Sequence, residues 1–458
     1  MAAMTDSAPT ADQEGQRYPL SFTQEWFLTL DQGDDGGTFG GRFLLIRPLH
    51  ITGPVDLAVL QDALDDVVAR HELLRTVVVR DADPPYQHVF PPCQVPLDVR
   101  DIPPATGKSR ELILQEILQQ TGTISAREVP LMRARLYRFD DRDSVLFLSV
   151  HHSATDDWSF EVIMRDLGVF YAARVTGTPA ELPPMRQYRE YAEWQRASAT
   201  SSAEDGAPAY WRDKLRGARE FTIPNDHGHP ESYSRPYSMH AHSIEADVMA
   251  RASAVAAASR TTVFSVLLSA FYVLAYQVTG ATDLTIRAFT AGREVEQFHN
   301  TMGLFLNVIP LRTSLDGCTS FRDIIARTRE TFIDAIAHEL PVNVIEQTFP
   351  GFVKSRDDLS TSQFIISSTA SQLGDAVTYP IAEDAREIAV RWLDEDGHRD
   401  IPSGMVWFVH MPAAGALTGS PMFNPGEFDE ATVAGWATDL RRILASAVAD
   451  PGQDWKAL

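Results

Sequence analysis

The sequence contains only two cysteines, Cys93 and Cys318, among 458 residues. So few thiols exclude the disulfide framework of small secreted domains and favour a reducing compartment. Residues 1–17 also lack the basic start and the apolar stretch of a secretory signal peptide, and we expect them to form a disordered tail. We therefore predict a cytoplasmic protein.

Long apolar runs and blocks of basic residues are also missing. The longest apolar stretch, residues 263–278, is shorter than the roughly 20 residues of a membrane-spanning helix, and Gly280 follows it as a helix C-cap would. We expect a buried helix there and no membrane contact. The formal net charge is −22. Nucleic-acid binding needs concentrated Lys and Arg, so no nucleic-acid partner is predicted.

The length and an ordinary globular composition predict two mixed α/β lobes. Residues 54–71 have the periodicity of an amphipathic helix, with Pro54 in its expected first turn. Two strand-like runs, 133–140 and 144–150, are joined by a polar turn. Small and polar residues frame a helical connector. The predicted division is a tail at 1–17, an N-terminal lobe at 18–185, a connector at 186–208 and a C-terminal lobe at 209–458.

The stretch VHHSATDDWS, residues 150–159, follows a buried strand and carries the chemistry. Adjacent strand positions point to opposite faces, so His151 and His152 cannot easily bind one metal ion together. We predict no metal site. Histidine titrates near neutral pH and is the usual general base. No G-x-S-x-G nucleophile motif occurs, so a catalytic histidine here would act without a covalent enzyme intermediate.

This stretch resembles the HHxxxDG signature of condensation domains from nonribosomal peptide synthetases. Further segments resemble that family's other blocks, in order along the chain. They are residues 21–30 (SFTQEWFLTL), 70–76 (RHELLRT), 188–195 (YREYAEWQ), 210–215 (YWRDKL), 288–294 (AFTAGRE), 302–313 (MGLFLNVIPLRT), 338–346 (HELPVNVIE) and 422–433 (MFNPGEFDEATV). The resemblance implies an α/β (α+β) fold of two chloramphenicol-acetyltransferase-like lobes in a V, with a central substrate tunnel.

The resemblance also implies roles for individual residues. His152 takes the catalytic position and His151 the structural one. Asp156 matches an aspartate that forms a structural salt bridge with an arginine, for which Arg293 is the first candidate and Arg287 the second.

Asp157 stands where the family has glycine. It could narrow the tunnel, or add a negative charge beside His152. Related noncatalytic platform domains also carry two aspartates here, but they lose one histidine, and this chain keeps both.

Four further residues are candidates for the substrate tunnel: Trp158, Ser159, Asn307 and Thr369. Each has a structural alternative or a weak signal. Trp158 and Ser159 could instead shape the start of the following helix, with Ser159 as its N-cap. Asn307 could be a buried, hydrogen-bonded asparagine.

The implied function is transfer of an acyl or aminoacyl group from a carrier-protein thioester to an amine or alcohol. The partners would be an acyl or peptidyl carrier protein and a small-molecule acceptor. No cofactor is expected on the chain itself, because the carrier supplies the phosphopantetheine arm. The sequence suggests a free-standing, monomeric enzyme. Two alternatives stay open: a catalytically silent platform that recruits a tailoring enzyme, and an acyltransferase that uses acyl-CoA.

Overall fold

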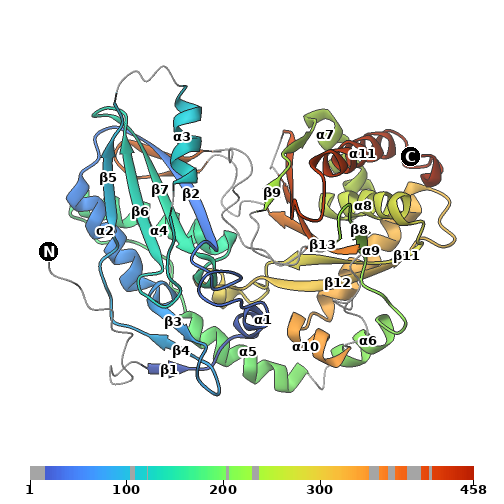
Figure 1. Ribbon diagram of the computed structural model, residues 1–458, viewed down its shortest axis with the longest axis horizontal. Coiled ribbons are helices and arrows are strands. Elements are labelled where there is room, and N and C mark those ends of the chain that lie inside the picture. The colour runs from blue at the N-terminus through green and yellow to red at the C-terminus, as the bar shows by residue number, and fades with distance from the viewer. Residues whose placement is uncertain are drawn as a thin grey trace.

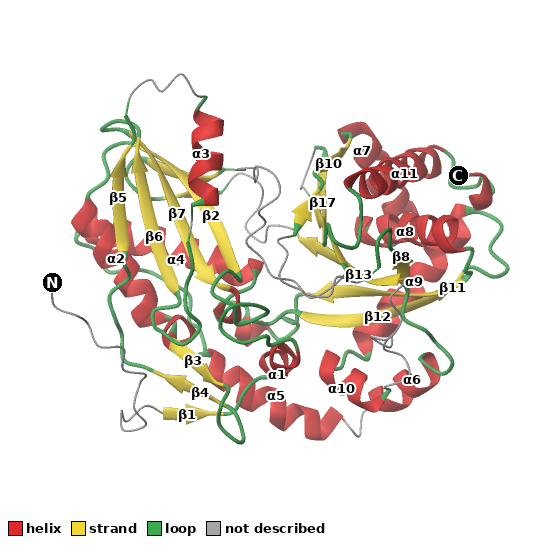
Figure 2. Ribbon diagram, in the orientation of Figure 1, coloured by secondary structure: helices red, strands yellow, loops and turns green. Residues whose placement is uncertain are grey.

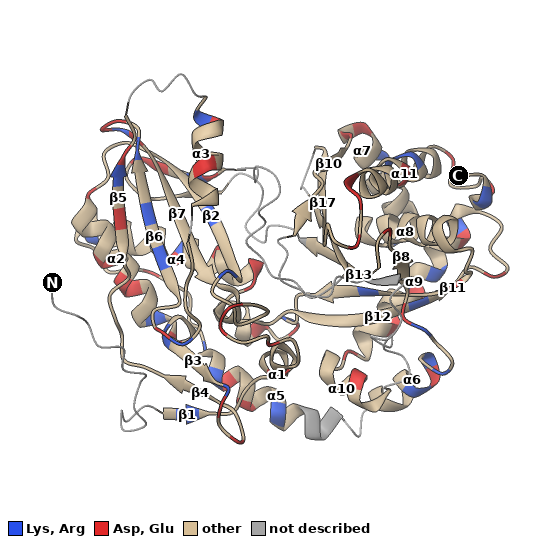
Figure 3. Ribbon diagram, in the orientation of Figure 1, with Lys and Arg blue, Asp and Glu red and all other residues tan. Residues whose placement is uncertain are grey.

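The computed structural model describes residues 16–103, 109–120, 122–202, 206–228, 237–349, 361–369, 377–388, 404–411 and 415–458. Two lobes lie side by side, each with a central sheet and packed helices (Figures 1 and 2). The mixed helix and sheet architecture confirms the predicted fold class. Lys and Arg are scattered over both lobes in the view of Figure 3, rather than gathered on one of them.

The N-terminal lobe is built on a six-stranded sheet. Its order is β14 (Thr378–Tyr379), β15 (Asp384–Glu387), β2 (Leu44–Thr52), β7 (Asp143–His151), β6 (Met132–Arg138) and β5 (Leu97–Asp101). A smaller sheet pairs β1 (Gln16–Tyr18), β4 (Tyr86–Val89) and β3 (Thr76–Val79). The expected pair of strands around the polar turn is the antiparallel β6–β7 hairpin. Its apolar side chains are buried, which makes β7 the centre of the lobe.

Helices cover this sheet on both faces. The core on one side includes residues of α2 (Leu57–Arg70) and α4 (Asp157–Thr176). A separate apolar cluster joins α3 (Arg110–Gln119) to side chains of β6 and β7. The short helices are α1 (Phe22–Thr29), η1 (Glu72–Arg75) and η2 (His152–Ala154). Helix α2 starts later than predicted, because the Asp56 carboxylate accepts the amides of Ala58 and Val59 and so caps it; Pro54 precedes the helix.

The C-terminal lobe has its own sheet, with strand order β10-β17-β16-β13-β11-β12. The strands are β10 (His242–Ile244), β17 (Leu417–Phe423), β16 (Met405–His410), β13 (Thr361–Thr369), β11 (Asp283–Thr290) and β12 (Asn307–Ser314), with β8 (Thr222–Pro224) paired to β13 and β9 (Ser238–Met239) paired to β17. Its helices are α7 (Ala246–Ala258), α8 (Val263–Thr279), α9 (Phe321–Ala337), α10 (Val342–Thr348) and α11 (Glu430–Ala449), with η3 (Glu296–Phe298) and η4 (Trp455–Ala457).

Helix α8 is the long apolar run of the sequence. Thr262 caps its start, Gly280 ends it in a left-handed conformation, and most of its side chains are buried in the lobe core. In the described part of the chain no single helix is long and apolar enough to cross a membrane. Helices α7 and α8 meet that criterion only as a pair, bent by 105°.

Helices α5 (Tyr188–Ser202) and α6 (Ala207–Lys214) connect the lobes. Two segments that follow the connector return to the N-terminal lobe. Strand β15 pairs with β2. In addition, Phe298, Met302 and Phe305 belong to the N-terminal lobe's core. The predicted assignment of all residues from 209 onward to the C-terminal lobe therefore needs correction at 377–388, because β2 offers an edge that β15 completes.

Candidate active site

The two histidines lie where the central strand β7 ends. His151 is the last residue of β7, and its neighbour Leu44 lies on β2. His152 begins the one-turn helix η2, and α4 starts directly afterwards. The carboxylate of Asp156 caps α4 by accepting the amide N–H of Ser159 at 2.8 Å. The motif is thus a strand-to-helix turn whose ends are fixed by a sheet and a cap.

His151 is fully buried and acts as a support. Its Nε2–H donates to the carbonyl of Gly40 at 3.1 Å, so Nδ1 is the unprotonated nitrogen. Nδ1 in turn accepts from the amide of Ser153 at 3.1 Å and lies 2.8 Å from the Ser153 hydroxyl. Burial lowers the pKa of His151 to about 4. The ring is therefore neutral at physiological pH and holds the turn in place.

His152 donates its hydrogen bond from the other ring nitrogen, Nδ1. Its Nδ1–H donates to the carbonyl of Thr155 at 2.7 Å, which leaves the lone pair of the neutral ring on Nε2. The ring stacks on Phe43, with centroids 4.7 Å apart and planes 19° apart, and Phe27 meets it edge-on. The side chain is partly exposed, in contrast to His151. An imidazole that is oriented through Nδ1, with Nε2 as the basic nitrogen of its neutral tautomer, is the arrangement that a general base needs.

Asp156 joins the start of α4 to the segment between β11 and β12. Its Oδ1 lies 3.2 Å from Nη2 of Arg293, and its Oδ2 accepts the amide of Phe305 at 2.9 Å. Both side chains are buried. The ion pair expected between Asp156 and Arg293 is therefore present. Arg287, the second candidate, instead pairs with Glu220 and Glu346 in the C-terminal lobe.

Arg293 is held from several directions. Nη1 donates to the carbonyls of Phe298 and Thr301 at 3.0 and 2.8 Å. Its guanidinium lies 3.9 Å from the centre of the Phe305 ring and 5.3 Å from that of Trp158. Burial lowers the pKa of Arg293, although Asp156 beside it acts in the opposite direction. This cluster fixes the segment 293–305 against the start of α4.

Two of the tunnel candidates belong to this structural cluster. The indole N–H of Trp158 donates to the carbonyl of His299 at 3.0 Å. The prediction of Ser159 as the N-cap is wrong, because the Asp156 carboxylate takes that place. The Ser159 hydroxyl instead donates to the carbonyl of Gly303 at 2.7 Å, accepts the Gly303 amide at 2.9 Å and contacts Arg293. Both side chains brace the start of α4 against the segment 293–305.

The other two tunnel candidates lie at strand ends of the C-terminal lobe. The side-chain amide of Asn307 donates to Glu339 at 2.7 Å and to the carbonyl of Leu340 at 2.9 Å, and its oxygen accepts the amide of Val342 at 2.9 Å. Asn307 thus matches the structural alternative. Thr369 ends β13, and its side chain lies outside the described part. The tunnel stays a prediction.

Asp157 is the first residue of α4, and its carboxylate forms an ion pair with Arg47 of β2. Burial alone would lower the pKa of Arg47, but the carboxylates of Asp157 and Glu387 raise it. The negative charge introduced at the family's glycine position is therefore balanced by a neighbouring cation.

Several contributors to the site were not found from the sequence. Phe43, Phe27 and Gly40 contact the histidines from more than 100 residues away, and Arg47 is equally distant from Asp157. No local pattern marks such partners. Thr155 lies inside the motif, and only the backbone geometry of the turn shows that its carbonyl orients His152.

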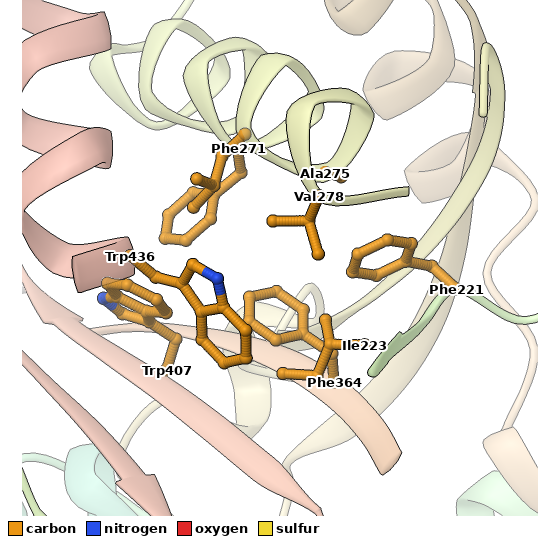
Figure 4. Close-up of a pocket in the computed structure, with 9 residues that line it drawn as sticks. Phe221, Ile223, Phe271, Ala275, Val278, Phe364, Trp407 and Trp436 are labelled. Atoms are coloured by element: carbon orange, nitrogen blue, oxygen red, sulfur yellow. The ribbon is translucent and has the colours of Figure 1, made fainter. Parts of the chain in front are cut away.

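An apolar cavity lies elsewhere, in the C-terminal lobe (Figure 4). Its volume is about 20 Å³, and Phe271, Phe364 and Trp407 are among the side chains that line it. Space for roughly one water without polar partners predicts a dry packing defect rather than a ligand site. In the described ranges no group of three or more His, Cys, Asp or Glu side chains is placed to hold a metal ion.

Comparison with known proteins identifies the family. Residues 14–458 match the family model of the condensation domain. The chain belongs to the condensation domain family. It is 29% identical over 445 residues to chondramide synthase of Chondromyces crocatus and 29% identical over 449 residues to the phosphinothricin tripeptide synthetase PhsC of Streptomyces viridochromogenes. These matches cover 95% and 96% of this chain, but only 11% and 40% of the relatives.

Two solved structures are similar to this chain over nearly its whole length. SgcC5 from Streptomyces globisporus, in complex with (R)-(-)-1-(2-naphthyl)-1,2-ethanediol and sucrose, is 32% identical with a TM-score of 0.85, and the match covers 95% of this chain and all of that one. The X-domain in complex with OxyB from teicoplanin biosynthesis is 25% identical with a TM-score of 0.78, over 100% and 99% of the two chains. These neighbours confirm the predicted two-lobed fold of the condensation domains.

Proposed function

We propose that this condensation domain transfers an acyl or aminoacyl group from the phosphopantetheine thioester of a carrier protein to a hydroxyl group of a small acceptor, forming an ester. The observation that carries the proposal is the orientation of His152. The hydrogen bond from its Nδ1 to Thr155 leaves Nε2 as the basic nitrogen on a partly exposed ring. An alcohol is a poor nucleophile that needs such a base more than an amine does.

The reaction balances without a cofactor on this chain. The acceptor oxygen attacks the thioester carbon, so that a C–O bond forms and the C–S bond breaks. The hydroxyl proton passes to Nε2 of His152 and from there to the departing sulfur. The products are an ester and the free thiol of the carrier's arm. Because a thioester is already activated, positioning of the acceptor supplies much of the remaining rate enhancement.

The choice of an alcohol over an amine is supported by the SgcC5 structure, which holds an aromatic 1,2-diol. At 32% identity over nearly the whole chain, that ligand is a reasonable guide to an acceptor class. We therefore propose an aromatic 1,2-diol as the acceptor class. Phe43 stacks on the ring of His152 and Phe27 meets it edge-on, and both are buried, so they orient this base beside the acceptor.

The test is acyl transfer from a loaded carrier protein, followed by intact-protein mass spectrometry. The acceptors are (R)-1-(2-naphthyl)-1,2-ethanediol and the matched amino alcohol in which the terminal hydroxyl is an amine. We expect diol-dependent loss of the acyl group from the carrier. His152→Ala should slow it by about 10²- to 10⁴-fold. His227→Ala, which removes an exposed histidine paired with Asp429, is the control and should leave the rate unchanged. Equal rates for His152→Ala and wild type would overturn the role of His152.

A silent platform is the second candidate, favoured by Asp157 and by the likeness to the X-domain that was solved with OxyB. The ion pair of Asp157 with Arg47 weakens this reading, because the added charge is balanced and both histidines are retained. A platform would bind the loaded carrier and leave it intact with every acceptor. An enzyme that uses acyl-CoA would instead prefer the CoA thioester when both donors are offered at equal concentration.

A further inference from the structure

Asp157, Arg47 and Glu387 form a chain of charges across three elements of the N-terminal lobe. Asp157 begins α4, Arg47 lies on β2 and Glu387 ends β15. The guanidinium of Arg47 contacts the carboxylate of Asp157 and lies 3.2 Å from Oε1 of Glu387. The three side chains are 31% to 42% exposed, so both ion pairs are in partial contact with water. One cation therefore links two carboxylates that are 230 residues apart in the sequence.

The register of the sheet explains why Arg47 reaches Glu387. Glu387 pairs with Leu49 of β2, and Arg47 lies two residues before Leu49. Positions two apart on a strand project from the same face, so Arg47 and Glu387 are diagonal neighbours on that face. The start of α4 lies over this same face, since Arg47 also lies 5.9 Å from the centre of the Phe160 ring.

Residues 377–388, which we call the crossover segment, are thus held against α4 at two places along the helix. In the middle of the helix the fit is steric: a Cβ on Gly168 would lie 2.8 Å from Pro380 and 3.2 Å from Tyr379. At the start of the helix the contact is ionic, through Arg47. Asp156 meanwhile holds the segment 293–305. The two adjacent aspartates therefore hold the two segments by which the later part of the chain enters the N-terminal lobe.

We infer that Asp157 is a positioning residue, which holds strand β15 against the start of α4 through Arg47 and Glu387 and so fixes the turn that carries His152. On this view the aspartate at the family's glycine position adds a second link between α4 and the later part of the chain, and does not mark a silent site. The kinetic part of this inference rests on the proposed function. The structural part does not.

Hydrogen exchange tests the structural part. The rate is measured by mass spectrometry in peptides covering 378–387, for wild type, Asp157→Asn, Glu387→Gln and the double variant. Each single change should speed exchange two- to fivefold, as expected for a partly exposed ion pair. The double variant should exchange no faster than the faster single one, because both changes break the same chain through Arg47.

Glu383 provides the matched control. It lies on the same crossover segment and pairs with Arg142, apart from Asp157, with both side chains more than half exposed. Combining Glu383→Gln with Asp157→Asn should therefore multiply the two effects. If Asp157→Asn leaves exchange in 378–387 unchanged, or its effect multiplies with that of Glu387→Gln, the inference is overturned.

Kinetics tests the consequence for catalysis. We expect Asp157→Asn to raise KM for the loaded carrier about threefold with kcat within twofold, since bound substrate restores the geometry of the turn. The KM ratio of variant to wild type should fall toward one at high salt, which screens the pair. Faster transfer by Asp157→Gly than by wild type would overturn the inference, because it would show that Asp157 obstructs the site. If wild type transfers no acyl group at all, the proposed function fails and the exchange result alone decides on the link.

Discussion

Replacing Asp156 by alanine should cost far more stability than any exposed charge on this chain. Three losses add. The N-cap of α4 is worth about 1 kcal/mol. The amide of Phe305 loses its acceptor, at about 1 kcal/mol or more. Arg293, whose side chain is completely buried, keeps a charge without a counter-ion, which costs about 3 kcal/mol after allowance for its two backbone acceptors. The sum is about 5 kcal/mol.

Two further variants separate these contributions. Asp156→Asn keeps one acceptor oxygen, which can still cap α4 through the amide of Ser159, but its NH2 group cannot accept the amide of Phe305. It should therefore lose the parts due to the charge and to Phe305, about 4 kcal/mol. Asp156→Ala combined with Arg293→Met removes the stranded cation and should be about 3 kcal/mol more stable than Asp156→Ala alone.

The assay is equilibrium unfolding in urea, followed by tryptophan fluorescence. Domains usually unfold with about 5 to 15 kcal/mol, so Asp156→Ala could lie close to the limit of folding, and Asp156→Asn remains measurable in that event. A loss below 1 kcal/mol for Asp156→Asn would refute the reasoning. So would an Arg293→Met change that costs the same with and without Asp156.

Three other outcomes follow from individual residues. His151 has a pKa of about 4 in the fold against about 6.5 when unfolded, so its stabilising effect is present above pH 6.5 and is lost as the pH falls toward 4. This loss is about 3 kcal/mol, and His151→Asn should flatten the urea midpoint between pH 6.5 and 4. Partial desolvation and the neighbouring Glu339 raise the pKa of Glu294 to about 8, so its stabilising effect is complete below its unfolded pKa and is lost as the pH rises through 8. Glu294→Gln should therefore have a higher urea midpoint than wild type at pH 8.5 and the same midpoint at pH 4. Gly303→Ala would place a Cβ 2.1 Å from the Tyr188 ring, which hydrogen bonds to Ser21 and Leu304 hold in place. We expect a loss of about 3 kcal/mol in unfolding free energy, whereas Gly435→Ala in α11, with nothing within 4 Å, should be neutral or stabilising.

Local patterns in the sequence were sufficient to predict the strands that carry the histidine motif and the longest apolar helix. The β6–β7 hairpin and the buried helix α8 follow from alternating or continuous apolar residues and from the residues that end them. The pairing of Asp156 with Arg293 came from the family resemblance, because the two residues are 137 positions apart and no periodicity connects them.

Two predictions were wrong, the N-cap at Ser159 and the lobe assignment of residues 377–388, and both errors have a similar physical cause. Asp156 and Ser159 are both good N-caps, and propensity alone does not separate them. The choice is made by Gly303 of the segment 293–305, which binds the Ser159 hydroxyl, so Asp156 is left to cap the helix. The return of 377–388 to the first sheet was missed for a similar reason. A strand's partner depends on which edge is open, and that edge, β2, lies more than 300 residues earlier.

This return of β15 has a consequence for synthesis on the ribosome. Strand β2 ends at Thr52, and its partner β15 ends at Glu387. At about 5 to 20 residues per second, the ribosome needs roughly 20 to 70 s to make the intervening chain. Throughout that time the nascent N-terminal sheet has an unpaired edge, which is a template for aggregation. Slow translation or crowding of polysomes should therefore lower the soluble yield of this chain more than its final stability would suggest.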